Sequence, residues 1–325
     1  MTGYVPSQEL VGRAVRGEIA AIGRLISRAE SGVPEARPAL AEIYRCPNRA
    51  HVIGITGVPG SGKSTLVGAL TKRLRAAGSK IGIIAIDPSS PYSGGSILGD
   101  RIRMTELATD TGVYIRSMAT HGAVGGMARA TLEAVDILVL GGFDTIIIET
   151  VGVGQDEVDI AKASDTTIVV SAPGLGDDVQ AVKAGMLEIA DIHAVSKCDR
   201  SDANRTLADL KQMLMLDAAK LASADWQVPV VGVSSVTGEG LDALLDAIRR
   251  HRVLAAEGEG GRRRHRAIAD FRLRKTAEIL LFERFDAFSA VFGAGQRERL
   301  RDRLDDPYTL AHELVSAFLA QGLGS

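Results

Sequence analysis

The sequence has few cysteines, no excess of charge of either sign and no long apolar run. Its 325 residues include only two cysteines, Cys46 and Cys198, which excludes a disulfide scaffold and favours a reducing, cytoplasmic compartment. Lysine and arginine number 38 against 40 acidic residues, so the net charge is −2 and the basic excess of a nucleic-acid binder is missing. No run approaches the about 18 apolar residues of a membrane span, and residues 1–16 lack the apolar core of a secretory signal. We therefore expect a cytoplasmic protein that binds neither membrane nor nucleic acid.

Hydrophobic periodicity divides the chain into three parts. Residues 1–50 carry apolar residues three and four apart, which predicts a helical extension that is broken at Pro34 and Pro38 and followed by a short helix over 39–44. Residues 51–255 alternate Ile/Val runs with helical stretches. The runs lack polar alternation, which is typical of strands buried on both faces, so this part is predicted as an α/β domain with a mostly parallel, doubly wound sheet. The predicted strands are 51–56, 81–86, 113–116, 145–149, 166–171, 192–195 and 228–233, and the predicted helices are 63–77, 124–140, 176–189, 203–219 and 239–252.

Residues 256–325 contain helical patterns and no strand pattern. Gly258, Gly260 and Gly261 predict a flexible joint, which the basic run 262–266 follows. We expect this run to be the solvated start of a helix, and the alternative is a docking site for an acidic partner. The predicted helices are 267–290, 295–304 and 307–320. Their apolar residues favour a dimerisation region, with packing on the chain's own α/β domain as the alternative.

A phosphate-binding loop is the strongest motif. Gly57, Val58, Pro59, Gly60, Ser61, Gly62, Lys63, Ser64 and Thr65 match G-x-x-x-x-G-K-[ST], between a predicted strand and a predicted helix. Glycines let backbone N–H groups converge on phosphate oxygens without a Cβ clash. We expect Lys63 to reach the β- and γ-phosphates and the Ser64 hydroxyl to ligate Mg²⁺.

A second motif, Ser196-Lys197-Cys198-Asp199, follows the predicted strand 192–195. Guanine-specific proteins carry N/T-K-x-D in this place, where the Asp carboxylate accepts from guanine N1–H and the 2-amino group. Adenine lacks this donor pair, so Asp199 predicts selection of GTP and GDP, and the stem of Lys197 is expected to cover the base. By position, Ser234, Ser235 and Val236 are expected at the base edge.

Three carboxylates follow predicted strands and are candidates for one metal site. Asp87 ends strand 81–86, Asp100 lies further on, and Glu149 ends strand 145–149. The alternative for Asp87 and Asp100 is a turn or helix cap. Beyond Glu149, Gly152 is expected to contact the γ-phosphate through its N–H group, and Val153 stands where Ras-like proteins have a water-orienting Gln.

The chain resembles the GTPase chaperones of adenosylcobalamin-dependent acyl-CoA mutases, the ArgK/MeaB type of the SIMIBI class of P-loop GTPases. The resemblance covers about 51–255 and rests on four segments: GITGVPGSGKST (54–65), AIDPSSPYSGGSILGDRIRM (85–104), GFDTIIIETVGVGQDE (142–157) and APGLGDDVQAVKAGMLEIAD (172–191). The sequence differs at Ser196-Lys197-Cys198-Asp199, where family members usually have Asn-Lys-Ala-Asp.

The resemblance implies GTP hydrolysis with Mg²⁺, a homodimer formed largely through C-terminal helices, and a role in gating cobalamin delivery to a mutase and protecting it. It implies that Asp87, Asp100 and Glu149 ligate or orient Mg²⁺ and, with Lys63, form the catalytic group. It also implies that Gln180 and Lys183 form a switch that senses nucleotide and contacts the mutase. From spacing alone, these two residues share one helix face, and a solvated face is the alternative.

Two other functions are weighed against the chaperone. A small-molecule kinase, of the amino-acid transport type, would use the same phosphate loop, but guanine selection by Asp199 is unusual in metabolite kinases. A nickel metallochaperone of the same class would carry segments rich in His or Cys, and six scattered His with two Cys argue against it.

Overall fold

The computed structural model describes most of the chain. The described residues are 4–47, 50–87, 107, 109–119, 126–150, 156–174, 186, 188–218 and 226–322. The chain forms two compact units, residues 1–272 and residues 273–325. In the described ranges no helix is both long and apolar enough to cross a membrane.

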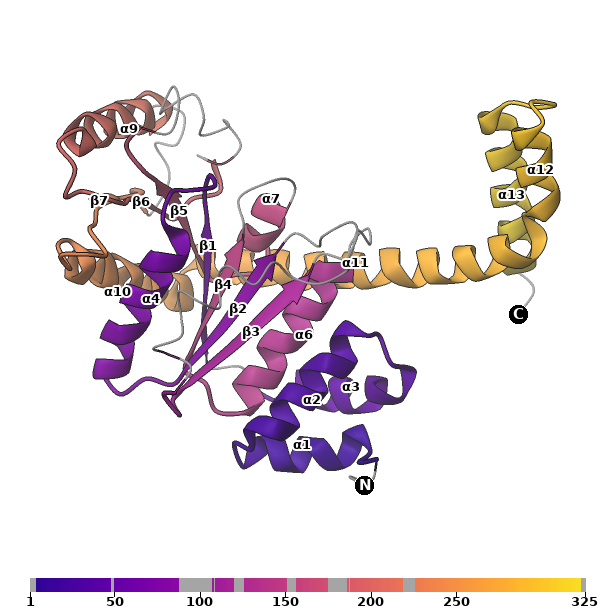
Figure 1. The fold of residues 1–325 in the computed structure, drawn as a ribbon, viewed down its shortest axis with the longest axis horizontal. Coiled ribbons are helices and arrows are strands. Elements are labelled where there is room, and N and C mark those ends of the chain that lie inside the picture. The colour runs from indigo at the N-terminus through magenta and orange to yellow at the C-terminus, as the bar shows by residue number, and fades with distance from the viewer. Residues whose placement is uncertain are drawn as a thin grey trace. The chain divides into compact units, whose positions relative to one another are not determined.

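The first unit contains a seven-stranded parallel sheet, as the sequence predicted (Figure 1). The strand order is β3-β2-β4-β1-β5-β6-β7, so the first strand lies in the middle of the sheet. The strands are β1 (His51–Thr56), β2 (Ile81–Asp87), β3 (Val113–Ala119), β4 (Thr145–Thr150), β5 (Thr166–Ser171), β6 (Ile192–Val195) and β7 (Val230–Gly232). Strand β3 is longer and β7 shorter than their sequence patterns predicted. In β1, β4, β5 and β6 every residue is buried, which explains why these strands lack polar alternation.

Helices cover both faces of this sheet (Figure 1). Because successive side chains in a strand point to opposite faces, Ile146 and Ile148 pack in the cluster formed with α6 (Gly126–Leu140) and the N-terminal helices. Ile147 packs on the other face, with α4 (Lys63–Ala76) and α10 (Leu241–Glu257). The remaining helices of this part are the short helix α7 (Asp156–Ala161), which the sequence pattern did not predict, and α9 (Ala203–Ala218). Most of the predicted helix 176–189 lies outside the described residues.

The N-terminal extension forms several short helices rather than one interrupted helix. They are α1 (Ser7–Val15), α2 (Ile19–Glu30), the 3-10 turn Pro34–Ala36 and α3 (Arg37–Tyr44). The chain turns at Gly17, whose φ of 77° is accessible to glycine. Pro38 does not break a helix: it lies in the first turn of α3, where the missing N–H would have no intrahelical acceptor. These helices share a core with α6, so the extension belongs to the first unit.

The predicted glycine joint is also corrected. Gly258 separates α10 from the long helix α11 (Glu259–Phe292), but Gly260 and Gly261 lie inside α11. A Cβ on Gly261 would lie 1.6 Å from the Ala255 carbonyl oxygen. The absence of a side chain therefore allows close packing of the two helix ends, and flexibility is not needed to explain this glycine.

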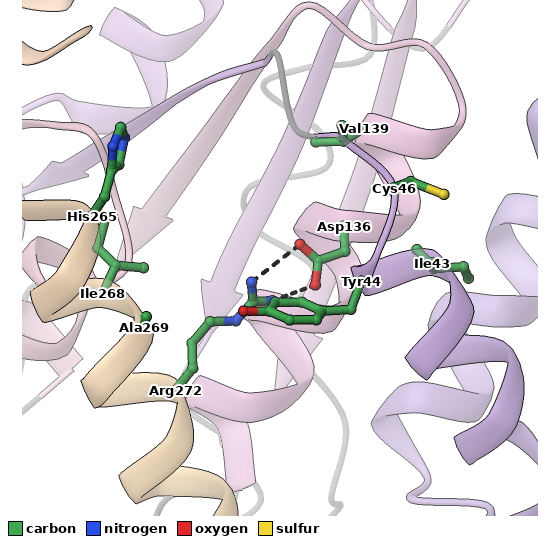
Figure 2. Close-up of a pocket in the computed structure, with 9 residues that line it drawn as sticks. All are labelled: Ile43, Tyr44, Cys46, Asp136, Val139, His265, Ile268, Ala269 and Arg272. Carbon is green, nitrogen blue, oxygen red and sulfur yellow. Dashed lines mark hydrogen bonds and ion pairs between the residues drawn. The ribbon is translucent and has the colours of Figure 1, made fainter. Parts of the chain in front are cut away.

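The part of α11 in the first unit is anchored to α6 (Figure 2). The Arg272 guanidinium forms an ion pair with Asp136, donates to the Leu132 carbonyl at 2.9 Å and stacks over the Tyr44 ring at 4.9 Å. Burial raises the pKa of Asp136, and Arg272 opposes this shift. This contact borders a pocket of ≈ 320 Å³ lined by Ile43, Tyr44, Cys46, Asp136, Val139, His265, Ile268, Ala269 and Arg272.

The second unit consists of the rest of α11, α12 (Ala294–Arg301) and α13 (Pro307–Gly322). Phe285 and Phe288 of α11 each lie 5.5 Å, between ring centroids, from Phe318 of α13. Many apolar side chains of this unit are exposed, among them Leu273, Leu281, Phe282, Val291, Phe292, Leu304, Tyr308 and Leu319. Exposed apolar residues in this number are typical of an interaction surface.

Candidate nucleotide site

The phosphate-binding loop connects β1 to α4. Gly57 has a φ of 144°, and a Cβ on it would lie 2.1 Å from the Val170 carbonyl oxygen of the neighbouring strand β5. Glycine is therefore required where the loop leaves the sheet. Lys63 begins α4, and its buried Nζ donates to the carbonyl oxygens of Gly57 at 2.7 Å and Val58 at 3.1 Å. The ammonium group is thus held inside the curve of the loop.

Two predicted metal ligands lie side by side at the end of this loop. The Ser64 hydroxyl donates to Glu149 Oε1 at 2.6 Å, although the two residues are 85 positions apart. Glu149 is buried in β4, which pairs with β1. The next residue, Thr150, donates through its hydroxyl to the Thr56 hydroxyl at 2.9 Å and so ties the ends of the two strands together.

The motif Ser196–Asp199, which is expected to bind the base, is attached to the phosphate loop by two side chains. The buried Ser196 hydroxyl donates to the Ser61 carbonyl at 2.5 Å. Lys197 has a φ of 56°, unusual for a residue with a side chain, and its Nζ donates to the Gly60 carbonyl at 2.8 Å. The Ser196 side chain, although shorter than the Asn of the N/T-K-x-D motif, therefore still reaches the loop.

Asp199 is exposed and oriented by a residue of the following segment. The Ser234 hydroxyl donates to its carboxylate, which lowers the pKa of Asp199 below that of an ordinary aspartate, and a backbone hydrogen bond adds to the shift. Ser234 also accepts from the Thr237 N–H at 3.2 Å, so its position is fixed from both sides. Ser235 is half-buried and the Val236 side chain exposed. Between the two motif residues, Cys198 donates to the Val195 carbonyl, and burial raises the pKa of its thiol.

Several predicted site residues lie outside the described part of the chain. The backbone of Asp87 ends β2, but its side chain is not among the described ones, and neither are Asp100, Gly152, Gln180 and Lys183. Within the described ranges no group of three or more His, Cys, Asp or Glu side chains is placed to hold a metal ion. The structure therefore places Lys63, Ser64 and Glu149 at the phosphate loop, attaches Ser196 and Lys197 to the same loop, and holds Asp199 beside Ser234.

A buried polar cluster at the amino ends of the strands, opposite the phosphate loop, was not predicted. The Thr166 hydroxyl lies 2.8 Å from His51 Nε2 and 2.9 Å from His251 Nδ1. His251 Nε2 is 3.3 Å from Asp191 Oδ1, which also accepts from Arg264 at 2.9 Å. Burial, with Arg252 and His251 nearby, lowers the pKa of His51 to about 3. Because these residues come from β1, β5, the residue before β6, α10 and α11, no local spacing in the sequence could have indicated the cluster.

Comparison with known proteins agrees with this geometry. A sequence model of the family described as "Methylmalonyl Co-A mutase-associated GTPase MeaB" matches residues 22–289. A protein of Pyrococcus abyssi (strain GE5 / Orsay) is 40% identical over 319 residues, which are 97% of this chain and 98% of that protein. The mouse protein "Methylmalonic aciduria type A homolog, mitochondrial" is 39% identical over 209 residues, 63% of this chain and 50% of the mouse protein. A crystal structure of a LAO/AO transport system kinase has a TM-score of 0.66 at 24% identity, covering 98% of this chain and 99% of that one, and shares the fold.

Proposed function

The chain belongs to the methylmalonyl-CoA mutase-associated GTPases and is a GTPase; on this premise we propose that its GTP cycle gates the delivery of adenosylcobalamin to an acyl-CoA mutase and protects that mutase. The observation that carries the proposal is the attachment of Ser196 and Lys197 to the phosphate loop. This attachment joins the segment expected to bind the base to the loop expected to bind the phosphates, so that one guanine nucleotide would contact both. The name of the mouse relative, which refers to methylmalonic aciduria, supports the choice of partner.

We assign the nucleotide contacts to both motifs and to their neighbouring segments. The backbone of residues 57–65 and the N–H group of Gly152 surround the β- and γ-phosphates. Lys63 then exchanges the carbonyl groups of its own loop for phosphate oxygens. Asp199 accepts from guanine N1–H and the 2-amino group, and the stem of Lys197 covers the base. The segment of Ser234, Ser235 and Val236 borders the base edge.

Magnesium fits the donor set beside the loop. The Ser64 hydroxyl and the Glu149 carboxylate are hard oxygen ligands only 2.6 Å apart, and Mg²⁺ prefers such ligands. We propose that Ser64 and Glu149, together with Asp87 and Asp100, would hold Mg²⁺. Bound there, the ion would offset the negative charge of the phosphates. Lys63, Asp87, Asp100 and Glu149 together form the proposed catalytic group.

Hydrolysis by the chain alone is expected to be slow. Val153 cannot orient the attacking water as the Gln of Ras-like proteins does, and positioning and charge stabilisation supply nearly all of phosphoryl-transfer catalysis. A mutase that orders the segments around the nucleotide would raise the rate, with Gln180 and Lys183 as the proposed contact switch. We further propose that the chain works as a homodimer assembled through the exposed apolar residues of the second unit.

The test measures GTP turnover with and without the cobalamin-binding subunit of a methylmalonyl-CoA mutase. We expect a slow basal rate that rises on addition of the subunit, and we expect Gln180→Ala and Lys183→Ala to reduce that rise while leaving the basal rate nearly intact. Transfer of adenosylcobalamin to the mutase, followed by its absorption spectrum, should depend on GTP. A fast basal rate, with no response to the mutase and with phosphate transferred to a small acceptor, would favour the kinase instead.

A further inference from the structure

The first turns of α11 carry an arginine-rich face that the GTPase site does not use. The basic run 262–266 was expected to be solvated as a whole, but Arg264 points into the first unit. Its Nε donates to the Ser164 carbonyl at 2.9 Å, Nη1 to Asp191 Oδ1 at 2.9 Å, and Nη2 to the Thr167 hydroxyl at 3.0 Å. These bonds fix the rotation of the helix about its axis at this point. The orientation of the remaining arginines is therefore determined, although their own side chains are exposed.

Three of these arginines gather around one hollow. Arg262, Arg263 and Arg266 are exposed and, with Glu259, border a surface hollow of ≈ 300 Å³. None of the four side chains has an ion-pair or hydrogen-bond partner within the described ranges. Arg262 and Arg266 are four residues apart and Arg263 and Arg266 three apart, so the three guanidinium groups lie on one face over little more than a helical turn.

This face is remote from the nucleotide phosphates. Of the residues that Arg264 contacts, Asp191 immediately precedes β6 and Ser164 lies just before β5, whereas the phosphate loop follows the end of β1. Because β1, β5 and β6 are parallel, Ser164 and Asp191 lie at the amino ends of the strands, and the phosphate loop lies at their carboxyl ends. A ligand of the arginine face would consequently not compete with GTP.

We infer that Arg262, Arg263 and Arg266 form a docking surface for an acidic helical segment of a partner protein, separate from the GTPase site. Guanidinium groups pair with carboxylates in bidentate geometry, and carboxylates four residues apart on a helix match the spacing of Arg262 and Arg266. Glu259 at the same hollow disfavours a compact dianion such as phosphate, but it can pair with a cation one turn along a protein helix. The chain's net charge of −2 also provides no general attraction for a nucleic acid or an anionic membrane.

The test uses the full-length protein and a fluorescent, alanine-based helical peptide with glutamates four residues apart on one face. Fluorescence anisotropy should show binding that weakens as ionic strength rises. The triple variant Arg262→Gln, Arg263→Gln, Arg266→Gln should lose about tenfold in affinity or more. A matched control, Arg205→Gln, Arg249→Gln, Arg250→Gln, removes three exposed arginines elsewhere in the first unit and should bind as the wild type does.

One further variant, expected to raise the affinity for the peptide, distinguishes a lost docking surface from a misfolded protein. Glu259→Gln removes the one carboxylate of the hollow and should tighten binding of the glutamate peptide by a few fold, which a damaged protein would not do. GTP binding should be unchanged in every variant. The proposal is wrong if the two triple variants lose peptide affinity equally, or if Glu259→Gln does not bind the peptide more tightly than the wild type. It is also wrong if the same arginines bind a DNA duplex or phosphatidylserine vesicles more tightly than the peptide.

Discussion

Replacing Asp199 by Asn should reverse the base preference of this GTPase. The carboxylate offers two acceptors to the two donors of guanine, N1–H and the 2-amino group. The Asn amide keeps one acceptor and replaces the other with an N–H donor, which would face the 2-amino group. Ser234, which now donates to Asp199, can still donate to the amide oxygen, so the side chain should keep its position.

The expected loss is one hydrogen bond to a charged acceptor and the gain of one repulsive donor–donor contact, together about 2–4 kcal/mol. This corresponds to about 30- to 1,000-fold weaker binding of GDP. Xanthine has a carbonyl oxygen in place of the 2-amino group, so the Asn amide can donate to that oxygen and accept from N1–H. The variant should therefore bind XDP more tightly than GDP.

Dissociation constants for GDP, XDP and ADP, measured by calorimetry for both proteins, test this reversal. Asp202→Asn is the matched control, because Asp202 is a nearby, partly exposed carboxylate that pairs with Arg200 outside the motif. If Asp199→Asn still prefers GDP to XDP, or if Asp202→Asn weakens GDP equally, Asp199 does not read the base and the guanine assignment is wrong.

The remaining predictions concern the phosphates, acid stability and assembly. Lys63→Ala should abolish tight GTP binding, because the phosphate oxygens lose their ammonium partner. If calorimetry gives this variant the GTP affinity of the wild type, residues 57–65 are not the phosphate-binding loop. The folded-state pKa of His51, about 3, lies below the 6.5 of an ordinary histidine, so the unfolded chain takes up this proton first as the pH falls between those values. This group should lower the free energy of unfolding by about 1.4 kcal/mol per pH unit through that range. In urea titrations carried out at several pH values, His51→Gln should flatten the slope by that amount, and an unchanged slope would contradict the lowered pKa of His51. Leu281→Glu should dissociate the proposed homodimer in light scattering, while Thr276→Glu at a polar exposed position should not, and a dimer that survives Leu281→Glu would place the interface elsewhere.

The sheet and the phosphate loop were predictable because their determinants are local. A parallel strand buried on both faces needs a continuous apolar run, and a phosphate loop needs glycines, Lys63 and Ser64 within nine residues. The helix ends were less predictable. Gly261 was interpreted as a hinge because glycine is compatible with flexibility, yet here it permits contact with Ala255. Composition alone does not separate these two uses of glycine.

By itself, the sequence determined which chemical groups this protein has: a phosphate loop, the Asp199 carboxylate that we propose reads the base, and a parallel sheet to hold them. Tertiary structure decided which groups meet. Ser196 reaches Ser61 across 135 positions, because β6 lies one strand away from β1 on the far side of β5. Ser64 reaches Glu149 across 85 positions, because β4 pairs with β1 on its other side. The rotation of α11 likewise separates the inward-pointing Arg264 from its exposed neighbours. Apolar patterns identify strands and helices but carry no record of which strand pairs with which, because that order depends on how the whole chain buries its apolar surface.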